Sequence, residues 1–159
     1  MRIEPYLYFD GNCAEAIEFY LKVFNGEKTF VTLYKDAPFP VAEEYKDKVM
    51  HASITFHDGD ASNRNTIMFS DIMPDKCGEH KVGSSVHLSI GMTNFESLNG
   101  IFNRFVEHKD TKVGMPLAKQ FWGSIYGNLV DPYGVNWMFS CPEEKKETDK
   151  SSEAPAEGK

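Results

Sequence analysis

Two stretches of this sequence, 82 positions apart, share one apolar pattern, and this repeat constrains the fold more than any other feature. Each begins with an asparagine, Asn12 or Asn94, a residue type that favours the N-cap of a helix. Apolar residues then recur at three- and four-residue steps, as on the buried face of an amphipathic helix: Ala16, Phe19, Tyr20, Val23 and Phe24, and again Leu98, Ile101, Phe102, Phe105 and Val106. We therefore predict an internal repeat.

Strand-like segments surround both helices in the same order. β-Branched and aromatic residues are concentrated at residues 3–9, 29–34, 49–57 and 66–70 in the first half, and at 86–92, 125–130 and 135–141 in the second. The residues between 35 and 48 are predicted to form a loop. We predict an α+β fold of two βαβββ modules, about 2–70 and 85–141, within a single domain at residues 1–142.

Alternation in two of these strands separates an apolar face from a polar one. In residues 49–57 the apolar side chains occupy even positions, and His51 lies on the opposite face. In residues 86–92, His87 lies on the polar face in the same way. Imidazole groups on an open face can bind a ligand or transfer protons. We expect both histidines to contact a ligand, and His87 is the best candidate for a catalytic residue; the alternative is that neighbouring backbone or hydroxyl groups bind both rings.

The last two strands form a hairpin that carries several large aromatic residues. Its turn is Asp131-Pro-Tyr-Gly134, in which proline presets φ and glycine accepts a left-handed conformation. Trp122, Tyr126 and Trp137 lie before and within the hairpin. These rings are expected either to pack in the core or to form the aromatic wall of a ligand pocket.

Charge and hydropathy exclude several classes of partner. The net charge is −7, and no cluster of basic residues interleaves with aromatic ones, so nucleic acid is not expected as a partner. No apolar run is long enough to span a membrane, and the N-terminus does not resemble a signal peptide. Three distant cysteines suggest free thiols and a cytoplasmic location. Residues 143–159 contain no large apolar side chain and are expected to be disordered.

Four separated motifs resemble the vicinal-oxygen-chelate superfamily, which includes glyoxalase I, bleomycin-resistance proteins and dioxygenases. They are Pro5-Tyr-Leu-Tyr-Phe-Asp-Gly-Asn12, Val49-Met-His51, Phe121-Trp-Gly123 and Asp131-Pro-Tyr-Gly-Val-Asn-Trp137. Together they are most similar to the PhnB-like, or demethylubiquinone-methyltransferase-like, branch. The resemblance covers about residues 2–141. It implies cupped mixed sheets with helices on their outer face, which enclose a cavity, often across a homodimer.

Metal-dependent members of this superfamily hold the ion with one ligand on the first strand and one on the last strand of each module. The corresponding first-strand residues here are Pro5 and His87, seven positions before each helix cap. Met138 stands where the last strand of the second module should offer glutamate, and residues 66–70 contain no acidic side chain. Only His87 is a competent ligand, so we expect no standard metal site and no cofactor, although a divalent ion held differently remains the alternative.

These observations lead to three functional hypotheses. The first is a metal-free protein that binds a small, partly aromatic molecule through His51, His87, Trp122, Tyr126 and Trp137. The second is a metal-dependent lyase, isomerase or dioxygenase of the superfamily. The third is a non-catalytic scaffold whose cups are filled by side chains. An adenosyl-methionine methyltransferase is not supported, because no glycine-rich turn of the GxGxxG type follows a strand.

Overall fold

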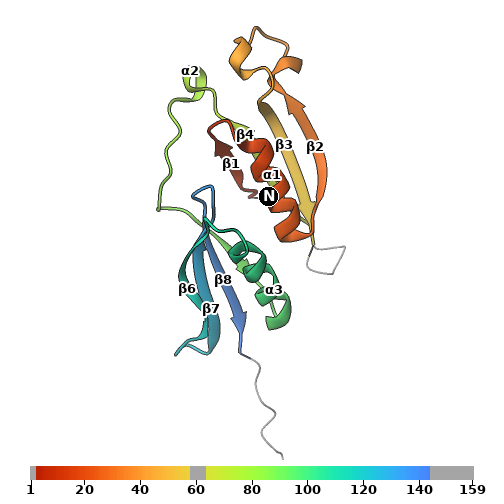
Figure 1. Ribbon diagram of the computed structural model, residues 1–159. Coiled ribbons are helices and arrows are strands. Elements are labelled where there is room, and N and C mark those ends of the chain that lie inside the picture. The colour runs from red at the N-terminus through yellow and green to blue at the C-terminus, as the bar shows by residue number, and fades with distance from the viewer. Residues whose placement is uncertain (1–2, 58–63, 144–159) are drawn as a thin grey trace, which may run out of the picture.

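A computed structural model of the chain describes residues 3–57 and 64–143 and shows two modules of the same build (Figure 1). The first module contains β1 (Tyr6–Phe9), α1 (Cys13–Phe24), β2 (Glu27–Leu33), β3 (Val49–Phe56) and β4 (Asn65–Asp71). The second contains β5 (His87–Gly91), α3 (Phe95–Val106), β6 (Lys112–Lys119), β7 (Ser124–Val130) and β8 (Asn136–Pro142). The predicted α+β fold of two βαβββ modules is confirmed.

The internal repeat extends to the ends of the helices. Both α1 and α3 have 12 residues, and each boundary of α3 lies 82 positions after that of α1. The strand order is also the same, β1-β4-β3-β2 in one sheet and β5-β8-β7-β6 in the other. In each sheet the first strand pairs in parallel with the last, and the remaining pairs are antiparallel. Neither sheet closes into a barrel, so β1 and β5 are edge strands.

Short helical turns interrupt two connections. The predicted loop at 35–48 overlaps two 3₁₀ turns, η1 (Tyr34–Asp36) and η2 (Glu43–Tyr45). A single turn, α2 (Pro74–Cys77), lies in the connection between the modules (Figure 1). Residues 58–63, between β3 and β4, lie outside the described residues, as does the tail after Glu143. No helix among residues 3–57 and 64–143 is long and apolar enough to cross a membrane.

The two helices are capped differently, although the sequence predicts asparagine caps for both. Asn94 accepts a hydrogen bond from the Ser97 backbone N–H at 2.8 Å. The Asn12 side chain makes no such bond, and Asp71 at the end of β4 accepts the Cys13 N–H instead, at 2.9 Å. Asp71 also accepts the Val49 N–H at 2.9 Å, so this buried carboxylate satisfies two backbone donors of different elements.

A register shift between β2 and β3 changes one predicted core position. Thr32 pairs with His51 but the next residue, Leu33, pairs with Val49. Val49 is therefore buried with Ala52 and Ile54, whereas Met50, which alternation assigns to the apolar face, is only partly buried.

One hydrophobic core spans both modules. The buried residues of α1, β3 and β4 form a single cluster with those of α3, β7 and β8. At its centre the Trp137 ring lies 5.1 Å from Phe105, 5.5 Å from Phe24 and 6.0 Å from Tyr20, measured between ring centroids. Because Tyr20 and Phe24 belong to α1 and the other two rings to the second module, each module completes the core of the other.

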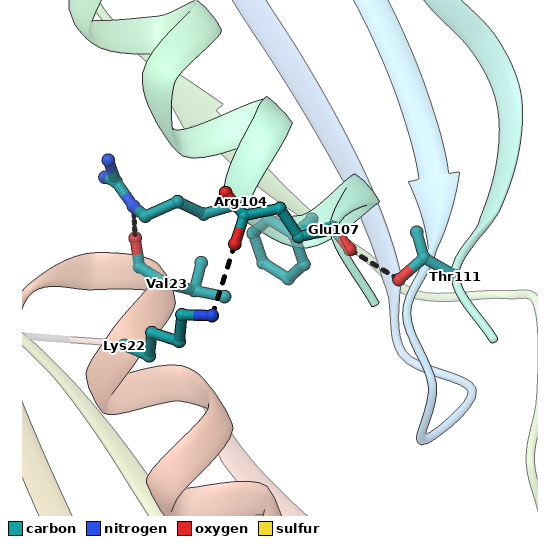
Figure 2. Close-up of polar contacts among 6 residues, drawn as sticks. Lys22, Val23, Arg104, Glu107 and Thr111 are labelled. Atoms are coloured by element: carbon teal, nitrogen blue, oxygen red, sulfur yellow. Dashed lines mark hydrogen bonds and ion pairs between the residues drawn. The ribbon is translucent and has the colours of Figure 1, made fainter. Parts of the chain in front are cut away.

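Polar contacts between the helices reinforce this junction (Figure 2). The Arg104 Nε–H donates to the Val23 carbonyl oxygen at 2.5 Å, which satisfies an acceptor in the last turn of α1. Lys22 and Glu107 form an ion pair at 3.2 Å, but both side chains are exposed, so its contribution to stability is small. The Thr111 hydroxyl donates to the Phe105 carbonyl oxygen at 2.6 Å, just beyond the end of α3.

The buried carboxylate of Asp131 is the most connected polar group at the junction. Its Oδ2 accepts the Tyr20 hydroxyl at 2.5 Å and the Trp137 Nε1–H at 2.8 Å. Its Oδ1 accepts the backbone N–H groups of Tyr133 and Val135 at 2.9 and 3.0 Å. Burial raises the pKa of Asp131, and the hydrogen bonds from Tyr20 and Trp137 oppose that rise. The side chain of Asp131 thus stabilises the predicted turn at 131–134 by accepting its backbone N–H groups.

Candidate functional site

The helices pack against one face of each sheet, and the opposite face carries exposed side chains such as Tyr8, Phe30 and His87. We call these opposite surfaces the concave faces, after the cups that the resemblance implies. On the first sheet, four rings from three strands follow one another across the concave face, and we call them the aromatic row: Tyr8, Tyr6, His51 and Phe30. Successive ring centroids are 5.0, 5.5 and 5.7 Å apart. Tyr8 and Phe30 at the ends are 50% and 49% exposed, so the row presents apolar surface to solvent.

A hydrogen bond fixes the centre of the aromatic row. The Tyr6 hydroxyl lies 2.9 Å from Nδ1 of His51, and the two rings stack with an interplanar angle of 28°. Burial, followed by the neighbouring Tyr8, raises the pKa of Tyr6 above its ordinary value. Tyr6 therefore remains a neutral phenol at physiological pH, with a proton available for a hydrogen bond.

An unpaired hydroxyl lies opposite the same histidine. Thr32 pairs with His51 across β2 and β3, so both side chains project from the same face. Within residues 3–57 and 64–143, Thr32 Oγ1 is the buried side-chain polar atom that has no hydrogen-bond partner. This hydroxyl is closed off from solvent and is a local weakness in stability.

The concave face of the second sheet carries three of the predicted site residues. His87 is exposed on the edge strand β5. Trp122 is 53% exposed, and its ring meets that of Tyr126 edge-to-face at 6.0 Å. Phe121, which is 96% exposed, lies edge-to-face against Trp122 at 4.8 Å. These rings form a second aromatic surface at the β6–β7 turn.

Trp137, which the sequence groups with these residues, lies elsewhere. It is 2% exposed and faces the helices, and its indole N–H donates to Asp131. Trp137 also lines a groove of about 750 Å³ whose wall includes residues of both modules. Leu7, Leu88 and Ile101 also line this groove, so its wall is largely apolar.

His87, the candidate metal ligand, belongs to no cluster of potential metal ligands among the described residues. No group of three or more His, Cys, Asp or Glu side chains that could hold a metal ion occurs in the part of the chain that the structure describes. Cys13 is buried, and burial followed by the nearby Asp71 raises the pKa of its thiol far above the ordinary value. Cys13 is therefore a protonated core residue rather than a nucleophile.

His51 and His87 lie on different sheets, and among the described residues no hydrogen bond or ring contact joins them. The sequence identifies His51 but not its neighbours Tyr6, Tyr8 and Phe30. The alternation Tyr6-Leu-Tyr8-Phe places both tyrosines on one face of β1, and this signal could have found them. Phe30 is brought to His51 by strand pairing, which sequence spacing does not reveal.

Comparison with protein families agrees with this architecture. The model of the "Glyoxalase/Bleomycin resistance protein/Dioxygenase superfamily" matches residues 2–139. Protein YjdN of Escherichia coli K12 is 25% identical over 150 residues, which cover 88% of this chain and 95% of that protein. The uncharacterized protein Mb0911c of Mycobacterium bovis is 29% identical over 146 residues, which cover 88% of this chain and 82% of that protein.

Solved structures with the same fold are also similar. Protein PA1353 of Pseudomonas aeruginosa superposes with a TM-score of 0.73 at 29% identity, covering 91% of this chain and 99% of that one. A PhnB protein of Bacillus cereus, described as a putative 3-demethylubiquinone-9 3-methyltransferase, superposes with a TM-score of 0.65 at 24% identity, covering 89% and 99%. The second likeness shows the fold alone.

Proposed function

Because this chain belongs to the glyoxalase/bleomycin resistance protein/dioxygenase superfamily, we propose that it binds a small, partly aromatic molecule on the concave faces of its sheets. The observation that carries the proposal is the aromatic row, which exposes ring surface around a hydrogen-bonded histidine. Binding sites for small molecules combine such apolar surface with a few fixed polar groups. His87, Trp122 and Tyr126 supply the same combination on the second sheet.

We also propose that the binding cup is completed in a cytoplasmic homodimer. Each concave face is open in the single chain, and both carry half-exposed aromatic rings that a monomer leaves in water. A second copy that places its β6–β7 turn over the aromatic row would enclose a ligand between Trp122 and His51. The buried thiol of Cys13 suits a reducing compartment.

The ligand should be sought first on the protein itself. Native mass spectrometry of the full chain, purified without chelator, is expected to show a dimer that carries an organic adduct. The mass of the adduct identifies the first compound to test. A dimer with one metal ion per chain would instead favour the metal-dependent enzyme, whose activity should be lost on exhaustive chelation and restored by a divalent ion.

Substitution then locates the site. Trp122→Ala and His51→Ala should each weaken binding of the identified ligand by about 5-fold or more, because a stacked aromatic contact contributes about 1 kcal/mol beyond the area that it buries. Phe95→Ala is the matched control, since it also removes an exposed ring, 37% accessible, but from the first turn of α3. If both site variants bind as tightly as the wild type, the concave faces are not the binding surface.

A further inference from the structure

His51 has one ring nitrogen engaged and the other free. Nδ1 is bonded to the Tyr6 hydroxyl, and within the described residues Nε2 has no hydrogen-bond partner. Within the described residues, Thr32 Oγ1 is the buried side-chain polar atom that lacks a partner. Nε2 of His51 also lacks a partner in this part of the chain but is not among the buried atoms. It follows that Nε2 of His51 is open to solvent on the concave face.

The Tyr6 contact decides which nitrogen of the neutral ring carries the proton. A phenol is a stronger hydrogen-bond donor than a neutral imidazole N–H, and an imidazole lone pair is a stronger acceptor than a phenol oxygen. The favoured arrangement is therefore Tyr6 O–H donating to Nδ1. Ser70, the other hydroxyl beside Tyr6, directs its own proton to the Asp71 carbonyl oxygen at 2.8 Å, so its oxygen is a second acceptor near the Tyr6 proton, and a weaker one than the imidazole lone pair. The proton of the neutral His51 ring then resides on Nε2.

The neighbouring rings fix the direction of this N–H. Tyr6 and Phe30 lie on either side of His51, at 5.5 and 5.7 Å, and limit rotation of the imidazole. Tyr6 comes from β1, whereas Phe30 comes from β2 at the other end of the sheet order. The His51 ring is therefore flanked from both sides of β3, with Nδ1 engaged by Tyr6 and the half-exposed Phe30 as its other ring neighbour.

We propose that His51 is a fixed hydrogen-bond donor for the carbonyl oxygen of an aromatic ketone or similar planar carbonyl compound, and that Tyr6 is its positioning residue. This inference rests on the proposed function, because it assigns the ligand class of the same concave face. A planar ring suits the exposed faces of Phe30 and Tyr8, which are 49% and 50% accessible. The chain has a net charge of −7, which disfavours a carboxylate, so a neutral carbonyl fits better.

The first experiment needs no ligand. Long-range ¹H–¹⁵N NMR spectra of the full chain, recorded at alkaline pH, distinguish a protonated ring nitrogen from an unprotonated one. We expect the Nε2-protonated form in the wild type and a mixture of tautomers in Tyr6→Phe. Tyr8→Phe is the matched control, because Tyr8 contacts the Tyr6 ring but makes no ring contact with His51. An Nδ1-protonated wild type, or an unchanged Tyr6→Phe spectrum, would overturn the role of Tyr6.

The second experiment tests the ligand class with two probes of the same shape. Acetophenone presents a carbonyl oxygen where α-methylstyrene has a methylene group. In NMR titrations acetophenone should bind about 3- to 10-fold more tightly, as one net hydrogen bond allows. His51→Leu should remove this preference, so that both probes bind with equal affinity, whereas His51→Gln, which retains an N–H donor, should restore part of it.

Other outcomes of the titration refute the assignment without refuting the proposed function. Equal affinity for both probes, tighter binding of benzoate than of acetophenone, or no binding of any probe would each exclude the neutral carbonyl class. The proposed function itself fails only if the adduct found by mass spectrometry binds independently of Trp122 and His51.

Discussion

Replacing Asp131 by asparagine should destabilise the protein strongly, although the two side chains have nearly the same shape. The carboxylate accepts four hydrogen bonds, two at each oxygen. An asparagine keeps one oxygen and presents an NH₂ group to the other pair of donors. Two donors then lose their acceptor, at about 1–3 kcal/mol each, or roughly 2–6 kcal/mol together.

A second effect reduces this cost. Burial raises the pKa of Asp131, which shows that its charge is partly desolvated in the folded state, and asparagine carries no such penalty. We therefore expect a loss of about 2–4 kcal/mol, a large share of the 5–15 kcal/mol that is usual for a domain. Tyr20→Phe removes one donor and leaves three, so it should cost less, about 1.5–3 kcal/mol.

Urea denaturation followed by Trp fluorescence and by circular dichroism measures this loss. The midpoint should fall while the slope of the free energy against urea stays unchanged, because the surface exposed on unfolding is the same. Asp47→Asn is the control, since its side chain is 89% exposed and pairs only loosely with Lys35 at 3.4 Å. An Asp131→Asn protein within about 0.5 kcal/mol of the wild type would refute the four-donor description, because only surface substitutions are normally that mild.

Two further predictions concern single hydroxyl groups. Thr32→Val should raise the free energy of unfolding by about 1 kcal/mol, because it replaces a buried hydroxyl without a partner by an apolar group of similar shape; a loss of stability in the same denaturation assay would show that the hydroxyl is bonded. Burial, followed by the charges of Glu15 and Asp131, raises the pKa of Tyr133 from 10.0 to about 12. Its folded-state pKa is above the unfolded value, so the stability it contributes is present below pH 10 and is lost as the pH rises through about 12. Tyr133→Phe should flatten this alkaline decline, and an identical pH profile for the two proteins would contradict the raised pKa.

The sequence predicts the architecture well because the features that define the repeat are local. Helix stripes and turn residues depend on neighbours along the chain, so the two modules and the turn at 131–134 could be derived without a structure. The cap of α1 could not, because Asp71 reaches Cys13 from a strand 58 positions later in the chain.

The candidate site is harder to predict because alternation defines two faces of a strand but does not say which one meets the helices. Trp137 and Tyr126 both belong to the closing hairpin, yet one ring lies in the core and the other beside Trp122. The aromatic row depends on the pairing of β1, β3 and β2 across the sheet, and those contacts join residues far apart in sequence.

The shared core determines how the two modules of this protein unfold. Rings of α1 and β8 contact one another directly, and the Arg104 side chain holds the last turn of the other helix, so separating the modules exposes apolar surface on both. Native-state hydrogen exchange should therefore report the same opening free energy for the central amides of α1 and of α3, rather than a stable half and a labile half. The chain thus contains two similar units, which we expect to unfold as one.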